Sequence, residues 1–153
     1  MKVKIREDLA SGCEIHIHCQ SREQKEVKDL LFLLETAQKR IPASREGQTC
    51  LLSPAEILYG EAVDGNVFLY TRAEVYSYRY SLHFLSREYA RAGFFRCGKS
   101  SLLNLRRARQ LWPQPGGRLL VTLENDEQLL VSRRYAVLLR RRLEAGSEQE
   151  ETR

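Results

Sequence analysis

Turn-forming residues divide the chain from about residue 45 onward into short segments, and no other feature restricts its fold as strongly. The segments between the turns are short apolar or alternating runs, the pattern of β-strands. Asp64-Gly65 followed by Asn66 is the clearest hairpin signal. The expected strands are residues 49–52, 57–62, 67–71, 75–80, 94–96, 118–123 and 128–131. We therefore predict a mainly β (α+β) domain of short antiparallel strands with short helices at its periphery.

Two helices are expected within this β-rich part. Ser81 is a cap for the first, with Leu82, Leu85 and Tyr89 facing inward. Ser132 begins the second, which we expect to end at Gly146 and to be followed by a disordered acidic tail, residues 146–153. The inward side of this helix is expected to hold Tyr135, Leu138, Leu139 and Leu143. Residues 102–105 fit a turn or a short helix, and residues 108–112 fit a strand.

A different pattern occupies residues 1–44, which predict a β-β-α segment in front of the main domain at residues 45–145. Residues 1–8 and 13–20 alternate like strands, and a helix follows from Ser21 to about Lys39. Gln24 would complete a capping box with Ser21, and Pro42 would stop the helix. Such a segment is too small to be stable alone, so we expect it to dock on the main domain or to mediate dimerisation.

Positive charge is concentrated in one part of the sequence. The whole chain has 25 Lys and Arg against 20 Asp and Glu, but residues 87–142 alone have 13 against 4, and almost all of the 13 are arginine. Guanidinium groups match phosphates and guanine edges, so this distribution predicts a polyanion as the partner. A solvated basic face without a partner is the alternative that charge alone leaves open.

Residues 93–101, GFFRCGKSS, satisfy the pattern of a nucleotide-binding phosphate loop. The residues between its glycines should be small, whereas here they include Phe94 and Phe95. Only 53 residues follow Ser100, and they show no alternation of strands and helices. We therefore interpret the match as a coincidence and expect no nucleotide hydrolase.

No catalytic or metal-binding group of residues is expected. Cys13, His16, His18 and Cys19 would lie on both faces of a strand and so could not share one ion. Cys97 is interpreted as a buried, unreactive thiol. We expect no enzyme activity, cofactor or metal. Free cysteines and the absence of a signal peptide or a membrane-spanning run predict the cytoplasm.

The order of motifs along residues 45–143 resembles the LytTR DNA-binding domain of bacterial transcription regulators. That family has a strand that ends in an aromatic and an acidic residue, then a hairpin and a short helix. It next has F-x-R-x-x-[KRN]-S with a downstream asparagine, and it closes with a hairpin and V-S-R-x-Y at a helix start. The matching residues are Tyr59, Glu61, Phe94, Arg96, Lys99, Ser100, Asn104 and residues 131–135.

The resemblance implies an elongated β domain whose loops reach successive major grooves of duplex DNA. The implied base-contacting residues are Asn66, with Gly65 and Val67 as neighbouring alternatives, Lys99 and Arg134. Lysine and arginine can both donate to guanine edges, which agrees with these roles. The residues expected at the DNA backbone are Arg96, Ser100, Ser101, Arg106, Arg107, Arg109, Ser132 and Arg133.

The resemblance also predicts the setting in which the domain works. Residues 1–44 are too few for a receiver domain, so we expect a stand-alone regulator without phosphorylation control. Sites of the family are commonly paired repeats, which implies a homodimer on DNA. A small membrane protein is a further expected regulator. An RNA-binding module, with Tyr76, Tyr78 and Tyr80 as a stacking face, and a basic protein–protein adaptor are the alternatives.

Overall fold

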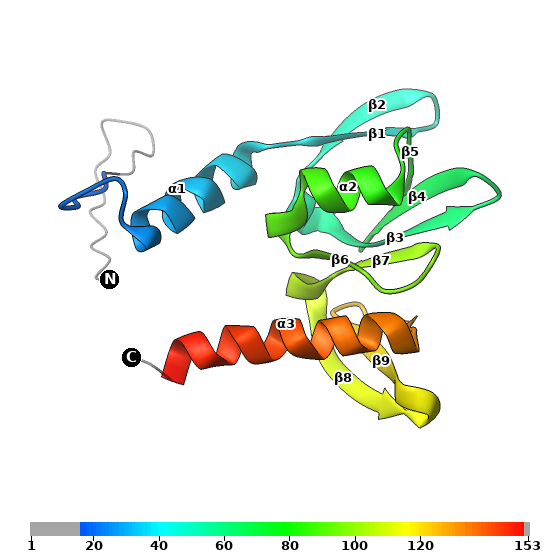
Figure 1. Cartoon of the computed structure of the whole chain (residues 1–153). Coiled ribbons are helices and arrows are strands. Elements are labelled where there is room, and N and C mark those ends of the chain that lie inside the picture. The colour runs from blue at the N-terminus through cyan, green and yellow to red at the C-terminus, as the bar shows by residue number, and fades with distance from the viewer. Residues whose placement is uncertain (1–15, 152–153) are drawn as a thin grey trace.

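The computed structural model describes residues 16–151, with the side chains of all but residues 35–38 and 146–151. Its ten strands form two antiparallel sheets (Figure 1). The first sheet has seven strands in the order β2-β1-β5-β4-β3-β7-β6, and the second has the order β10-β9-β8. The first sheet contains β1 (Ile41–Arg45), β2 (Gln48–Leu52), β3 (Ile57–Val63), β4 (Asn66–Thr71), β5 (Val75–Tyr78), β6 (Phe94–Arg96) and β7 (Ser101–Asn104). The second contains β8 (Ala108–Gln114), β9 (Arg118–Leu123) and β10 (Gln128–Val131).

The predicted fold class and its principal hairpins are confirmed. Asp64 and Gly65 have φ angles of 49° and 78°, which both central residues of a two-residue hairpin turn require, and they join β3 to β4. Glu46 and Gly47, with φ angles of 52° and 77°, make a second such turn between β1 and β2. The sequence interpretation missed β1, because Pro42 was taken as a helix stop. Pro42 is tolerated because only β2 lies beside this end of the strand.

Two separate cores lie on the two faces of the seven-stranded sheet. Helix α2 (Leu82–Glu88) covers the first, and the amide of Phe84 donates to the Ser81 hydroxyl at 3.0 Å, so the predicted cap is confirmed. Leu82, Leu85 and Tyr89 are buried there, as expected. The second core joins Tyr59, Leu103 and Cys97 to the second sheet and to helix α3 (Arg133–Glu151).

The last helix differs from its prediction in two ways. Its buried side holds Ala136 and Leu139, whereas Leu138 is 45% exposed and Leu143 46% exposed. Only a narrow side of α3 packs on the second sheet, so the predicted inward face was too wide. The helix also continues past Gly146 to Glu151, because a glycine inside a helix costs only about 1 kcal/mol. Residues 146–151 are therefore helical rather than the expected disordered tail.

The segment in front of the sheets also departs from the expected β-β-α unit. Residues 16–20 form no strand, and the rest of the two expected strands lies outside the described residues. Helix α1 runs over Lys25–Gln38 and begins later than predicted, since the first helical hydrogen bond runs from the amide of Lys28 to the carbonyl of Gln24. Residues 41–44, assigned by sequence to this segment, belong to β1 of the large sheet.

Helix α1 docks at the end of α2. The Arg91 guanidinium lies 4.1 Å from the centre of the Phe32 ring, and Lys39 forms an ion pair with Glu88. The Tyr89 hydroxyl donates to the carbonyl of Arg40 at 3.2 Å. These contacts lie beside the C-terminal end of α2 and leave the rest of the large sheet uncovered by α1 (Figure 1).

Candidate nucleic-acid interface

A tight loop between β6 and β7 presents Lys99 and Ser100 to solvent. The amides of Cys97 and Gly98 both donate to the carbonyl of Ser101, at 3.1 and 3.3 Å. Arg96 is folded over the loop, and its Nη2 donates to the carbonyl of Lys99 at 2.6 Å and to that of Gly98 at 3.3 Å. The loop conformation is thus fixed from inside by an arginine that the sequence had assigned to the DNA backbone.

This loop is bonded to the start of α3 and to β3, the strand that leads into the other segment predicted to contact bases. The amide of Ser132, just before α3, donates to the carbonyl of Cys97 at 2.9 Å. The amide of Ala62, near the end of β3, donates to the carbonyl of Ser100 at the same distance. Asn66 follows the tight turn after β3 and is exposed. We call the three segments, residues 64–67, 97–101 and 132–134, the loop rim.

The basic side chains of the loop rim form no ion pair with the described acidic residues. Lys99, Arg133 and Arg134 are exposed, and none of them takes part in an ion pair within residues 16–151. The Arg134 guanidinium lies 6.0 Å from the centre of the Tyr135 ring, a contact that leaves its nitrogens available for hydrogen bonds. Uncompensated cations on fixed loops are the arrangement that a polyanion requires.

Cys97 lies beneath the loop, as the sequence interpretation expected. The side chain is fully buried, and its Sγ is 3.3 Å from the Ser101 hydroxyl, to which it donates. Burial raises the pKa of the Cys97 thiol, which disfavours the reactive thiolate. Cys97 therefore acts as a small apolar residue beneath the loop.

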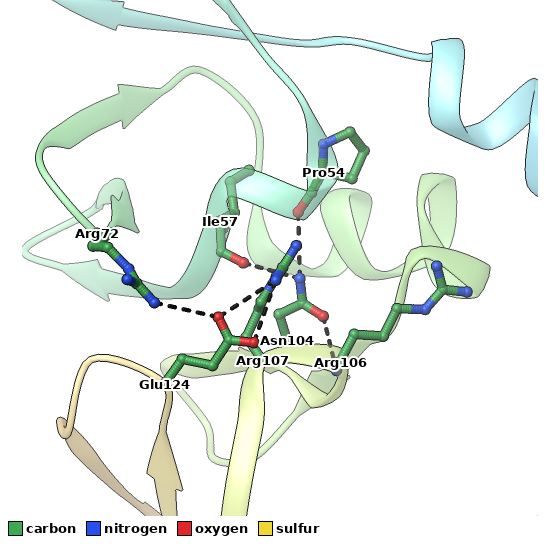
Figure 2. Close-up of polar contacts among 7 residues, drawn as sticks. All are labelled: Pro54, Ile57, Arg72, Asn104, Arg106, Arg107 and Glu124. Atoms are coloured by element: carbon green, nitrogen blue, oxygen red, sulfur yellow. Dashed lines mark hydrogen bonds and ion pairs between the residues drawn. The ribbon is translucent and has the colours of Figure 1, made fainter.

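A second group of basic residues, Arg106, Arg107 and Arg109, lies beyond the other end of β7 and is engaged within the protein. Figure 2 shows Arg107 and Arg72 meeting at the carboxylate of Glu124, with the closest nitrogen–oxygen separations at 3.3 Å for Arg107 and 3.6 Å for Arg72. Arg109 forms an ion pair with Asp126, and the Arg106 Nη2 donates to the carbonyl of Arg91 at 2.7 Å.

Asn104 organises the same region from the interior. It is fully buried, and its Nδ2 donates to the carbonyls of Ile57 at 2.9 Å and Pro54 at 3.3 Å (Figure 2). Its Oδ1 accepts from the amide of Arg106 at 3.1 Å, where the chain leaves the first sheet for the second. Asn104 is thus a structural member of the motif in which the sequence placed it. We call Asn104, Arg106, Arg107, Arg109, Glu124 and Asp126 the sheet junction.

The aromatic and acidic residues of β3 also join the two sheets. Tyr59 stacks on Tyr70 with ring centres 4.3 Å apart. Burial, followed by the nearby Glu127 in the β9–β10 turn, raises the pKa of Tyr59 above its ordinary value. Burial, followed by the nearby Glu61, raises the pKa of Tyr70 as well. Tyr59 therefore contributes to the second core and its link to the second sheet.

The structure gives no support to a phosphate loop at residues 93–100. Phe94 is buried and begins β6, which runs antiparallel to β7. Residues 101–104 after the lysine and serine form a strand, whereas a phosphate loop leads into a helix. The ambiguous residues 102–104 are thus part of β7, and the predicted strand at residues 108–112 is confirmed within β8.

Tyr76, Tyr78 and Tyr80 do not form the exposed stacking face that the RNA-binding alternative needs. Tyr78 is 5% exposed and belongs to the core under α2, and Tyr76 packs against that core. Tyr80, 45% exposed, stacks on Phe84 with ring centres 4.8 Å apart. Two of the three rings are therefore packed in or against the core and are not available to stack on bases.

The fold and the loop rim together define a class of protein: a mainly β domain whose exposed basic loops suit nucleic acid. Comparisons identify the family. The model of the LytTr DNA-binding domain family matches residues 47–144, so this chain belongs to the LytTR DNA-binding family, whose members are typically non-catalytic.

A solved structure shows the same fold. It is a LytTr DNA-binding domain from a Bacillus cereus protein described as a methyl-accepting/DNA response regulator, with a TM-score of 0.65 and 21% sequence identity. The similarity covers 69% of this chain and 97% of that one. No curated protein matches the chain. Among the described residues, no helix is long and apolar enough to cross a membrane.

The sequence interpretation assigned no binding role to Arg118, an exposed cation near the loop rim. Arg118 begins β9 directly after a turn that contains Gly116 and Gly117, and the sequence interpretation assigned these residues only to a turn and a strand. The sequence signal that could have indicated it is an arginine at the tip of a glycine-rich hairpin without acidic neighbours.

Proposed function

We propose that this protein is a transcription regulator that binds duplex DNA sequence-specifically and reads the major groove through the loop rim. The hydrogen bond between the amide of Ser132 and the carbonyl of Cys97 carries this proposal. It fixes the loop that bears Lys99 beside the helix start that bears Arg134, so both cations can approach one DNA surface.

Within this proposal Asn66, Lys99 and Arg134 contact base edges. Arginine can donate both terminal nitrogens to O6 and N7 of guanine, and lysine can donate to the same atoms. Ser100, Ser101, Ser132 and Arg133 lie in the same segments and are suited to phosphate oxygens, which fix register without reading sequence. Arg96 holds the loop, and the internal partners of Arg106, Arg107 and Arg109 favour a structural role for all three.

The setting of the regulator is also a proposal. Paired binding sites would bring two copies together on DNA, and the docked α1 segment is a candidate for contacts between those copies. We place the protein in the cytoplasm, with regulation by a small membrane protein as a further hypothesis that the family resemblance suggests.

The direct test is selection of bound duplexes from a random pool, followed by titration of the selected duplex. We expect one enriched sequence and a log–log dependence of affinity on salt with a slope of several units. Arg134→Ala should weaken binding to the selected duplex by about 1–3 kcal/mol.

Arg140→Ala is the matched control, because Arg140 is an exposed arginine of the same helix outside the loop rim. It should leave the affinity for the selected duplex nearly unchanged. Failure to enrich any sequence, or equal affinity of Arg134→Ala and the unaltered protein, would contradict the proposal. Preferential binding of single-stranded RNA in competition would favour the RNA-binding alternative.

A further inference from the structure

The turn between β8 and β9, residues 114–118, packs against the start of α3. Gly116 and Gly117 have φ angles of 77° and 76°, a conformation that favours glycine. A Cβ atom on Gly117 would lie 3.3 Å from Cγ of Arg133, so the turn passes close to the Arg133 side chain. This turn, which we call the β8–β9 tip, is therefore held beside a residue of the loop rim.

The strand pairing places the β8–β9 tip at the same edge of the protein as the loop rim. Leu119, the residue after Arg118, pairs with Val131 at the end of β10. Ser132 follows at once and is bonded to the loop that carries Lys99. Arg118 is thus connected to the loop rim through one strand pair and one hydrogen bond.

Arg118 is an exposed cation with a restrained side chain. Its Nε donates to the carbonyl of Pro115 at 3.1 Å, which leaves both terminal nitrogens for an external acceptor. No ion pair within residues 16–151 involves Arg118, and residues 113–118 contain no acidic side chain. Arg109, on the same hairpin, is instead paired with Asp126.

We propose that Arg118 is a further DNA contact, which binds the oxygens of a backbone phosphate next to the groove that receives Arg134. This inference rests on the proposed function and adds a fourth segment to the binding surface. A guanidinium with two free terminal nitrogens matches two phosphate oxygens. Because Nε is tied to the turn, the side chain suits a phosphate at the edge of the groove better than a base within it.

The test compares Arg118→Gln with the unaltered protein on two probes, the selected duplex and a random-sequence duplex of the same length. We expect affinity to fall about five- to tenfold on both probes at 0.1 M salt, and the log–log salt slope to decrease by about 0.9. Arg118→Lys should restore most of the slope because it keeps the charge.

Arg109→Gln is the matched control, since it removes an arginine of the same hairpin that already has an internal partner. Its salt slope should equal that of the unaltered protein. An unchanged slope for Arg118→Gln would overturn the inference, and so would a loss confined to the selected duplex, which would indicate a base contact. A reduced slope together with an unaffected Arg134→Ala would support the phosphate contact and contradict only the base-reading role of Arg134.

Discussion

The cations of the loop rim and of the sheet junction come from the same arginine-rich part of the sequence, yet the two regions use them in opposite ways. Lys99, Arg133 and Arg134 of the loop rim are exposed and take part in none of the ion pairs within residues 16–151. Arg107 and Arg109 of the sheet junction are paired with acidic residues of the β9–β10 turn. Local charge density therefore does not distinguish the two regions, whereas the distribution of acidic partners does.

The physical basis of this difference is the charge that remains after internal pairing. A carboxylate within reach neutralises the field of a neighbouring guanidinium, so the pair attracts phosphate only weakly. Glu124 and Asp126 supply such carboxylates at the sheet junction, and the turn that contains them is fixed by the pairing of β9 with β10. At the loop rim, the field of Lys99, Arg133 and Arg134 is not cancelled in this way.

The largest effect on the sheet junction should come from Asn104→Ala. The substitution removes the partners of the Pro54 and Ile57 carbonyls and of the Arg106 amide in a buried position. We expect the free energy of unfolding to fall by about 2–4 kcal/mol, because buried polar groups would be left without hydrogen bonds. Urea denaturation measures this change.

Asn125→Ala is a suitable control for Asn104→Ala, because the Asn125 side chain only accepts from the nearby Glu127 amide in an exposed turn. The Asn125→Ala variant should lose less than about 1 kcal/mol in the free energy of unfolding. If the Asn104→Ala variant were as stable as the unaltered protein, Asn104 would have no structural role. The sheet junction would then differ less from the loop rim than we infer.

A smaller effect, on DNA affinity, is expected from Arg96→Lys. Lysine keeps the charge but cannot reproduce the planar guanidinium that reaches the carbonyls of Gly98 and Lys99. We expect binding to the selected duplex to weaken about tenfold, or about 1.4 kcal/mol, while binding to a random duplex changes little. Thermal unfolding monitored by circular dichroism would verify that the fold is retained.

The exposed Arg87 of α2 provides the control, as Arg87→Lys changes the same residue type away from the loop rim. If Arg96→Lys bound the selected duplex as tightly as the unaltered protein, charge alone would suffice at this position. Arg96 would then belong with the residues at the DNA backbone, as the sequence first suggested.

The smallest effect is expected from Arg107→Met. The side chains of Arg107 and Glu124 are 32% and 36% exposed, so solvent screens their attraction, and Arg72 still neutralises Glu124 in the variant. The Arg107 Nε is also buried without a hydrogen bond, a cost that methionine removes. We expect a loss of about 0.5–1 kcal/mol in unfolding free energy.

The salt dependence of DNA binding separates Arg107 from the loop rim. The slope of the Arg107→Met variant should equal that of the unaltered protein. A slope reduced by about 0.9 would show that Arg107 contacts a phosphate, and the sheet junction would then be part of the DNA interface.

Local sequence signals predicted the elements that depend on nearby residues. Asp64-Gly65 specified a hairpin because its two residues accept positive φ angles, and Ser81 specified a helix start because its hydroxyl reaches the Phe84 amide. β1 was missed because its strand structure depends on pairing with β2 rather than on Pro42 itself. The predicted inner face of α3 was too wide, because the sheet beneath it decides which side is covered.

The same distinction separates the two arginine groups. By itself the sequence determined the strand-and-turn character of the domain, the family motifs and the basic stretch, since each depends on residue types at short spacing. Only the tertiary structure decided that Asn104 acts inside the protein, that Arg106 reaches the carbonyl of Arg91, and that the β8–β9 tip stands beside Arg133. These partners lie 15 to 50 positions apart in the chain and are brought together by sheet register and packing, and no local pattern encodes those distances.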